Sequence, residues 1–191
     1  MSTLEAPVQL RNVVRQFGQQ RVIECLDVDI APGEFVALLG ASGSGKTTLL
    51  RSLAGLDSID SGQLRVPKAR AAVFQEPRLM PWKRAWKNVV LGLRIPDTKA
   101  RAVQALTQVG LPHPLDAYPA TLSGGEAQRV ALARGMAGQP KLLLVDEPVA
   151  ALAAPTRIHL HPLNLHLFRQ LPPDAVFLHH DVPAAITVAP R

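Results

Sequence analysis

Apolar and polar residues alternate in the first part of the chain, with the period of a strand that has one buried face. In residues 26–30, three aliphatic side chains alternate with two aspartates. A Pro-Gly pair marks a turn, and residues 35–39 follow as an apolar run of strand length. The pattern predicts β structure over residues 8–39, and we expect its last strand to be buried on both faces.

Segments with helical composition alternate with apolar strands in the rest of the chain. Residues 101–109 and 124–137 are predicted to be helices, and residues 141–145 and 175–178 are predicted to be buried strands. A buried strand that follows a helix, twice over, indicates a parallel sheet covered by helices. We therefore expect an α/β fold.

The middle of the chain carries most of the helical signal. Between about residues 78 and 134 there is no strand comparable with those on either side. We expect one domain over residues 1–191, in which residues 1–77 and 135–191 form the α/β core and residues 78–134 form a helical subdomain.

Composition and charge limit the class of protein. The chain has 191 residues, of which 47% are apolar and 19% are charged, and this is a globular composition. No apolar run approaches the ~20 residues of a membrane-spanning helix, and the first residues do not resemble a secretion signal, so we expect a cytoplasmic protein. The only cysteine, Cys25, lies in an apolar stretch, which predicts a buried thiol without a catalytic role.

The formal net charge of +6 suggests an anionic partner, which the charge alone does not identify as nucleotide, nucleic acid or lipid. The densest basic segment is WKRAWK at residues 82–87. A solvated face is favoured there over a nucleic-acid contact, and we expect no nucleic-acid partner.

Residues 40–47, GASGSGKT, fit the phosphate-binding pattern G-x-x-x-x-G-K-S/T at every position, between an apolar strand and a helical stretch. Glycines let consecutive backbone N–H groups point at one phosphate, and the following helix adds its positive N-terminal end. Lys46 supplies a charge for the β- and γ-phosphates, and the Thr47 hydroxyl can bind Mg²⁺. A glycine-rich turn that matches by chance is the alternative.

Asp146 and Glu147 end a predicted buried strand, where a charge needs a partner. At the end of a strand beside a phosphate loop, Asp146 can bind Mg²⁺ directly or through water. Glu147 then lies closer to the γ-phosphate, where a carboxylate polarises the attacking water. Taken alone, the pair is equally explained as the beginning of a loop.

A third motif, LSGGEAQRVALARG at residues 122–135, narrows the class. Ser123 and Glu126 have the spacing of a capping box, and we expect the two glycines between them to leave backbone N–H groups bare for an anion. With Gln128 and Arg129, the motif resembles the signature of ATP-binding-cassette (ABC) ATPases. An ordinary capped helix is the alternative.

The resemblance to ABC ATPases covers nearly the whole chain. It implies a P-loop NTPase core with an N-terminal antiparallel β part and a helical subdomain that carries the signature. ATP and Mg²⁺ are the implied cofactors, with Thr47, Gln75 and Asp146 as the Mg²⁺ contacts. The residues implied to bind the nucleotide are Phe17, Gly40, Ala41, Ser42, Gly43, Ser44, Gly45, Lys46, Thr47, Thr48, Ser123, Gly124 and Gly125.

The same resemblance assigns roles to three further positions. Gln75 is similar to the glutamine of the family loop that contacts Mg²⁺ and water and senses the transmembrane partner. Phe17 stands where the family has an aromatic residue that stacks on adenine, although a Phe near a strand is more often part of a core. His180 resembles the switch histidine that contacts the γ-phosphate, so the implied catalytic residues are Glu147, His180 and Gln75.

In this family two cassettes pack head to tail, so that each ATP lies between the phosphate loop of one and the signature of the other. The resemblance therefore implies a second ATPase subunit, which we expect to be a second copy of this chain. It also implies transmembrane permease subunits and, indirectly, a periplasmic solute-binding protein. The expected location is the cytoplasmic face of the inner membrane.

Residues 74–94, FQEPRLMPWKRAWKNVVLGLR, are similar to the corresponding segment of subunits that energise bacterial import of aliphatic sulfonates, with relatives for taurine and nitrate. Met80 and Trp82 lie in this segment, in a loop that contains a proline. If exposed, they offer a seat for a membrane subunit, and if buried, they close the core of the helical subdomain.

The likeness weakens after Pro148. The family usually has an aspartate at the position of Ala153, and Pro155 and Pro162 fall where a continuous helix is expected. Two hypotheses follow: a working ATPase subunit of an importer, which we favour, and a shortened cassette that binds ATP but hydrolyses it poorly. An importer subunit for taurine, nitrate or another small anion is the alternative within the first hypothesis.

Overall fold

The computed structural model describes residues 8–32, 34–38, 40–41, 43–111, 116–146 and 175–178, and for Phe35, Ala37 and residues 175–178 it describes the backbone alone. These residues form two compact units. The first unit contains the described residues up to 70, together with 141–146 and 175–178, and the second contains those between 71 and 140. The domain limits at residues 77–78 and 134–135 stay a prediction.

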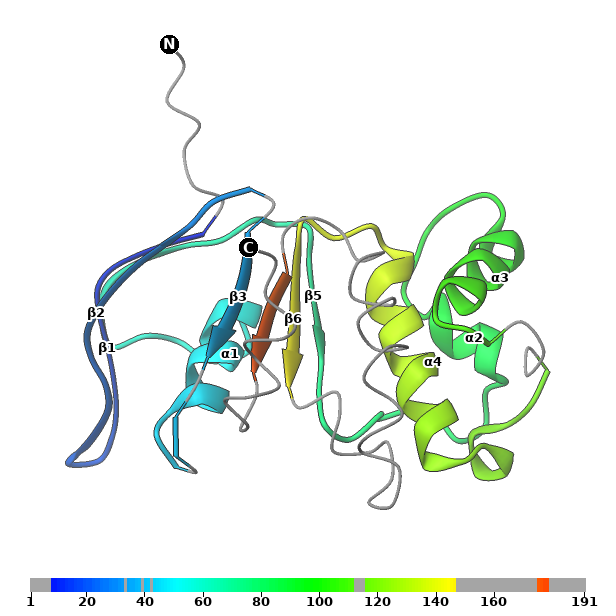
Figure 1. The fold of residues 1–191 in the computed structure, drawn as a ribbon, viewed down its shortest axis with the longest axis horizontal. Helices are drawn as coiled ribbons and strands as arrows, with labels where there is room; N and C mark the ends of the chain where they lie inside the picture. Colours follow the sequence, from blue (N-terminus) through cyan, green and yellow to red (C-terminus); the bar gives the residue numbers. More distant parts are fainter. Residues whose placement is uncertain are drawn as a thin grey trace, which may run out of the picture. The chain divides into compact units, whose positions relative to one another are not determined.

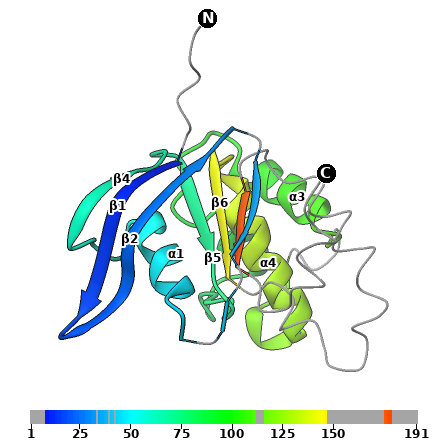
Figure 2. The ribbon, with the colours of Figure 1, turned by 60° about the vertical axis from the view of Figure 1, so that its left-hand side comes forward.

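An antiparallel sheet opens the first unit, with the strand order β2-β1-β4 (Figure 2). Its strands are β1 (Val8–Phe17), β2 (Gln20–Ile30) and β4 (Ser61–Arg65). On β1, Val8 and Leu10 are buried and alternate with more exposed residues, and Val13 is buried beyond an irregularity that breaks the alternation. The predicted β structure of the N-terminal part is confirmed.

The β1–β2 pairing has three register shifts, and the first two explain an error in the sequence analysis. The register shifts between Leu10 and Val13 and again between Val13 and Arg15, and the shifts coincide with positive φ angles of 48° at Asn12 and 45° at Cys25. An extra residue in one strand turns its neighbours out of the regular alternation. Cys25 is therefore exposed, and the prediction of a buried thiol is wrong.

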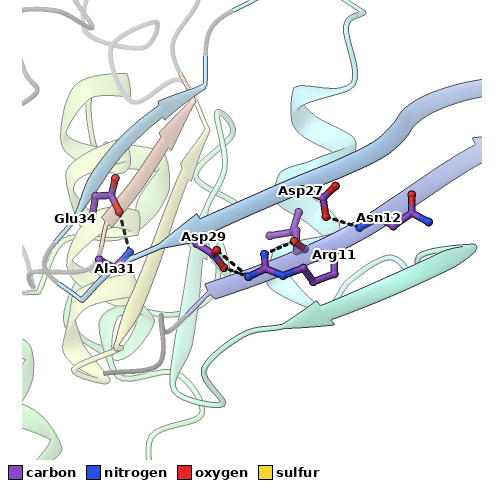
Figure 3. A network of polar contacts seen from close by, with 7 residues as sticks. Arg11, Asn12, Asp27, Asp29, Ala31 and Glu34 are labelled. Carbon is purple, nitrogen blue, oxygen red and sulfur yellow. Dashed lines mark hydrogen bonds and ion pairs between the residues drawn. The ribbon is translucent and has the colours of Figure 1, made fainter. Parts of the chain in front are cut away.

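Side chains of β2 stabilise this irregular pairing (Figure 3). The Asn12 N–H donates to Asp27 Oδ1 over 2.8 Å, so the bulged residue still has an acceptor. One residue before it, the guanidinium of Arg11 donates to both carboxylate oxygens of Asp29 over 2.7 Å. Asp27 and Asp29 therefore lie on the exposed face of β2 and accept hydrogen bonds from residues of β1.

The second sheet has the strand order β3-β7-β6-β5 (Figure 1). Its strands are β3 (Phe35–Leu38), β5 (Arg70–Val73), β6 (Leu142–Asp146) and β7 (Ala175–Leu178). The pairs β3–β7 and β6–β7 are parallel, and helix α1 (Lys46–Ala54) packs against β6 and β7. The predicted parallel sheet and the strands at 141–145 and 175–178 are confirmed.

Burial differs between two strands of this sheet. Leu142, Leu143, Leu144 and Val145 of β6 are all buried. By contrast, Val36 and Leu38 of β3 are only half-buried, because β3 is the edge strand of the described sheet. The expectation that this strand is fully buried is wrong for the two side chains that the structure describes.

The second unit is helical. It contains α2 (Ala85–Val89), α3 (Thr98–Gln108), a 3₁₀ turn at Pro119–Thr121 and α4 (Gly124–Ala137). The three α-helices pack on one another, and α4 buries Val130, Ala133 and Ala137 among others. Both predicted helices are confirmed. Within the described ranges, no helix has the length and hydropathy needed to cross a membrane.

Candidate functional site

The glycine-rich loop leads from β3 into α1, as the sequence predicts (Figure 1). Lys46, the first residue of α1, turns its ammonium group back onto this loop. Its Nζ atom donates to the carbonyl oxygens of Gly40 and Ala41, each over 2.7 Å, and to Ser44 Oγ over 3.2 Å. The cation therefore lies against the loop backbone, where a phosphate group would need it.

Gly45 fixes the junction between the loop and α1. It is the N-cap residue, with φ 88° and ψ 2°, and a Cβ atom there would lie 2.7 Å from the Val22 carbonyl oxygen of β2. Both the left-handed conformation and the close approach favour glycine. No side chain caps the helix, and the amides of its first turn at Lys46, Thr47 and Thr48 have no intrahelical acceptor.

The parallel register places Asp146 level with the end of β3, the strand that precedes this loop. Leu178 of the central strand β7 pairs with Leu38 of β3 on one side and with Asp146 of β6 on the other. Asp146, which is half-buried, is therefore level with the end of the strand that feeds the loop. Thr47, in the first turn of α1, and Asp146, at the end of β6, therefore both lie toward the carboxyl ends of these strands, and α1 packs against β6.

Helix α4 begins with the predicted capping box. Ser123 Oγ accepts from the Glu126 N–H over 3.3 Å, while Glu126 Oε2 accepts from both the N–H and the hydroxyl of Ser123 over 2.8 Å. The two hydrogen bonds that the Glu126 carboxylate accepts, led by the one from the Ser123 backbone, lower its pKa.

The capping box already bonds two backbone N–H groups at this helix start, those of Ser123 and Glu126. That the N–H groups of Gly124 and Gly125 between them receive an anion stays a prediction. A carboxylate also stands at the same helix end, where the helix dipole favours negative charge. An anion that approaches Ser123 therefore competes with Glu126 for the hydroxyl proton.

Comparison with known proteins identifies the class to which this arrangement belongs. The family model described as ABC transporter matches residues 23–150. The aliphatic sulfonates import ATP-binding protein SsuB 1 of Pseudomonas syringae pv. tomato is 74% identical over 189 residues, which are 99% of this chain and 70% of that protein.

The chain belongs to the ABC transporter family.

More distant relatives and solved structures agree with this assignment. The aliphatic sulfonates import ATP-binding protein SsuB 3 of Nocardia farcinica is 53% identical over 190 residues, which are 100% of this chain and 77% of that protein. A dimeric post-hydrolysis structure of an ATP-binding cassette bound to ADP and Pi matches with a TM-score of 0.79 and 28% identity, over 94% of this chain and 90% of that one. The predicted P-loop NTPase fold is confirmed.

Two exposed aromatic side chains belong to this ABC cassette. The ring of Phe17 at the end of β1 is 50% exposed, and the guanidinium of Arg15 lies 4.5 Å from its centroid, so the alternative of a core Phe is wrong. Trp82 is 70% exposed, which excludes it from the helical core, whereas Met80 is half-buried. The stacking of Phe17 on adenine stays a prediction.

The sequence analysis overlooked Asn88 of α2, a fully buried polar residue of the cassette. Its Oδ1 accepts from the Met80 N–H over 2.7 Å, and its Nδ2 donates to the carbonyls of Lys83 over 2.9 Å and of Met80 over 3.2 Å. Asn88 thus holds the loop that presents Trp82. An isolated Asn in a short amphipathic stretch gives no sequence signal of such a role.

Several predicted residues lie outside the described part of the chain: Ser42, Glu147, His180, Ala153, Pro155 and Pro162. Among the side chains that are described, no group of three or more His, Cys, Asp or Glu residues is arranged to hold a metal ion. Gln75 is described, and its exposed side chain follows β5 in the second unit.

Proposed function

We propose that this protein is the ATP-binding and ATP-hydrolysing subunit of an importer for aliphatic sulfonates. The observation that carries the proposal is the 74% identity, over 99% of the chain, with a protein named for aliphatic sulfonate import and ATP binding. The phosphate loop, with its lysine and its open helix N-terminus, supports the ATP-binding part of the proposal independently.

The loop suits the phosphates of a nucleotide. Its Lys46 ammonium and the N-terminal amides of α1 are donors, and a phosphate group supplies only acceptors. Lys46 must exchange the carbonyls of Gly40 and Ala41 for phosphate oxygens, and the neighbouring loop residues from Ser42 to Thr48 complete the cradle. Phe17, exposed at the end of β1, is available to stack on the adenine ring.

Oxygen ligands for Mg²⁺ are available at the same end of the sheet. The Thr47 hydroxyl and the Asp146 carboxylate are ligands of the type that Mg²⁺ prefers, and Gln75 is proposed as a third contact. When bound, Mg²⁺ neutralises charge on the phosphates and favours their in-line displacement. The chain's own residues position the nucleotide and accept the proton of the attacking water.

Hydrolysis is assigned to residues of two cassettes. Glu147 accepts the proton of the attacking water, and His180 contacts the γ-phosphate from the same chain. Ser123, Gly124 and Gly125 of a second cassette face that phosphate from the other side. This arrangement needs a dimer, and solved dimeric cassettes of similar fold support it.

Further partners follow from the importer role. Transmembrane permease subunits receive the motion of the dimer, and a periplasmic solute-binding protein delivers the solute to them. The cassette would then lie on the cytoplasmic face of the inner membrane, attached through the permease. No nucleic-acid partner is proposed.

Steady-state ATP hydrolysis tests the enzymatic part. We expect Mg²⁺-dependent activity that rises more than linearly with protein concentration and that is lost in Glu147→Gln, which should still bind ATP and remain dimeric. ATP binding without turnover at any concentration would favour the alternative, a cassette that binds ATP but hydrolyses it poorly. Near-normal turnover in the variant would remove Glu147 as the catalytic carboxylate.

Growth on defined sulfur sources tests the transported solute. A Pseudomonas strain that lacks its own corresponding relative should regain growth on an alkanesulfonate as sole sulfur source when it expresses this chain, but not when it expresses Lys46→Ala. Taurine as sulfur source and nitrate as nitrogen source are the parallel tests of the alternatives. Rescue on taurine or nitrate alone would transfer the assignment to that solute.

A further inference from the structure

Gln128 on α4 contacts the residue that precedes Gln75. The Gln128 side chain is 4% exposed, and its Nε2 atom donates to the carbonyl oxygen of Phe74 over 3.0 Å. Because a carbonyl only accepts hydrogen bonds, this contact fixes the orientation of the amide. Its Oε1 atom is buried without a hydrogen-bond partner in the described part of the chain, so the contact depends on the donor alone.

Arg134, in the last turn of the same helix, contacts the chain on the other side of Gln75. Its Nη2 atom donates to the carbonyl of Pro77 over 2.8 Å, and its Nη1 atom donates to the carbonyl of Arg78 over 2.9 Å. Burial lowers the pKa of Arg134. A planar guanidinium can span two successive carbonyls with its fixed fork, which a lysine ammonium does less well.

The segment between these two contacts is also closed on itself. Arg78 has a positive φ of 46°, an uncommon conformation for a side chain of this size. In this conformation its guanidinium lies 4.8 Å from the centroid of the Phe74 ring. The two ends of residues 74–78 are therefore tied to each other as well as to α4, whereas Gln75 and Glu76 between them are exposed.

We propose that Gln128 and Arg134 are positioning residues for Gln75: they hold the segment 74–78 on the helix that Ser123 caps, so that the Gln75 side chain projects from a fixed backbone. All the residues of this arrangement belong to the second unit. The functional consequence rests on the proposed role of Gln75 as a Mg²⁺ contact. The structural part rests on the hydrogen bonds alone.

Hydrogen exchange and Mg²⁺ titration of the ATPase separate these two parts. In Arg134→Ala, we expect peptides that cover residues 74–78 to exchange about tenfold faster, because two carbonyl contacts are lost. The Mg²⁺ concentration for half-maximal ATPase activity should rise severalfold with a smaller change in the maximal rate. Arg134→Lys should fall between the wild type and Arg134→Ala in both measurements.

Two further variants complete the design. Gln128→Met keeps the volume of the buried side chain and removes the donor, so it should loosen the same peptides even if Arg134→Ala fails to fold. Arg84→Ala is the matched control, because Arg84 bonds Asp116 and stacks over Tyr118 in the same unit, away from residues 74–78 along the chain. It should change neither measurement.

The outcomes are distinct. Unchanged exchange of residues 74–78 in both Arg134→Ala and Gln128→Met would overturn the positioning role. Faster exchange with an unchanged Mg²⁺ requirement would support the claim that α4 positions this segment. It would also remove Gln75 from the proposed Mg²⁺ contacts. If the wild-type protein showed no ATPase activity under any condition, the proposed function would be contradicted. The exchange result would still decide the positioning role.

Discussion

Asp146 and Leu38 lie level with each other across the parallel sheet, because each is paired with Leu178 of the strand between them. Leu38 is two residues before Gly40, where the phosphate loop begins. The carboxylate and the loop are separated by about a hundred residues in sequence, and the sheet register alone brings their strand ends together. The arrangement matches the general rule that ligands of open α/β sheets bind at the carboxyl ends of the strands.

Replacement of Lys46 by alanine should weaken ATP binding by at least about tenfold, because a charge-assisted contact to phosphate contributes roughly 1.5–3 kcal/mol. Titration with a fluorescent ATP analogue measures the effect. Lys68→Ala removes the same charge from an exposed position of the first unit and should bind as the wild type does. Equal affinities for the two variants would refute the assignment of the phosphate loop.

Replacement of Asn88 by alanine should lower the free energy of unfolding by about 3 kcal/mol, because buried backbone groups of Met80 and Lys83 lose their partner. Urea unfolding followed by circular dichroism provides the measurement. Asn88→Asp should be at least as unstable, since a carboxylate would face the two carbonyls. The exposed neighbour Lys87 is the control, and Lys87→Ala should unfold within experimental error of the wild type.

Acid should weaken the folded state through Glu126. Its pKa is lowered in the folded protein, so its contribution to stability is present above its unfolded value of 4.5 and is lost as the pH falls through the folded value. Between about pH 5 and pH 3, the stability of the wild type should therefore fall more steeply than that of Glu126→Gln. Glu24→Gln removes the same charge from an exposed position of β2 and controls for the change in net charge. If the stability of Glu126→Gln and of the wild type fell equally with pH, the role of the capping box would be contradicted.

Local sequence patterns predicted the secondary structure correctly where the chain follows a regular repeat. The alternation at residues 26–30, the apolar run of β6 and the Ser123–Glu126 spacing each predict what the structure shows, because strand periodicity and helix capping depend on neighbours in sequence. Cys25 shows the limit of this reasoning. A bulge adds one residue to a strand and reverses the faces of its neighbours, and the opposite strand decides where it occurs.

Composition also fails to show which polar groups a buried side chain contacts. The roles of Asn88 and Arg134 depend on carbonyl oxygens that are 5 to 57 residues away, and the motif around Arg134 predicts only that it belongs to a helix. The exposure of Trp82 was left open by the sequence for the same reason. Packing of the helices on one another decides which face of a loop remains accessible.

The sequence by itself determined the chemistry of this protein: a phosphate loop between a strand and a helix, two carboxylates after a buried strand, and a capped glycine pair that opens a helix. These features are local, because each needs particular side chains at fixed spacing along the backbone. The tertiary structure decided the register that sets Asp146 level with the loop, the bulge that exposes Cys25 and the contacts of Gln128 and Arg134 with residues 74–78. Those features depend on hydrogen bonds and packing between segments distant in sequence, whose relative placement only the folded chain fixes.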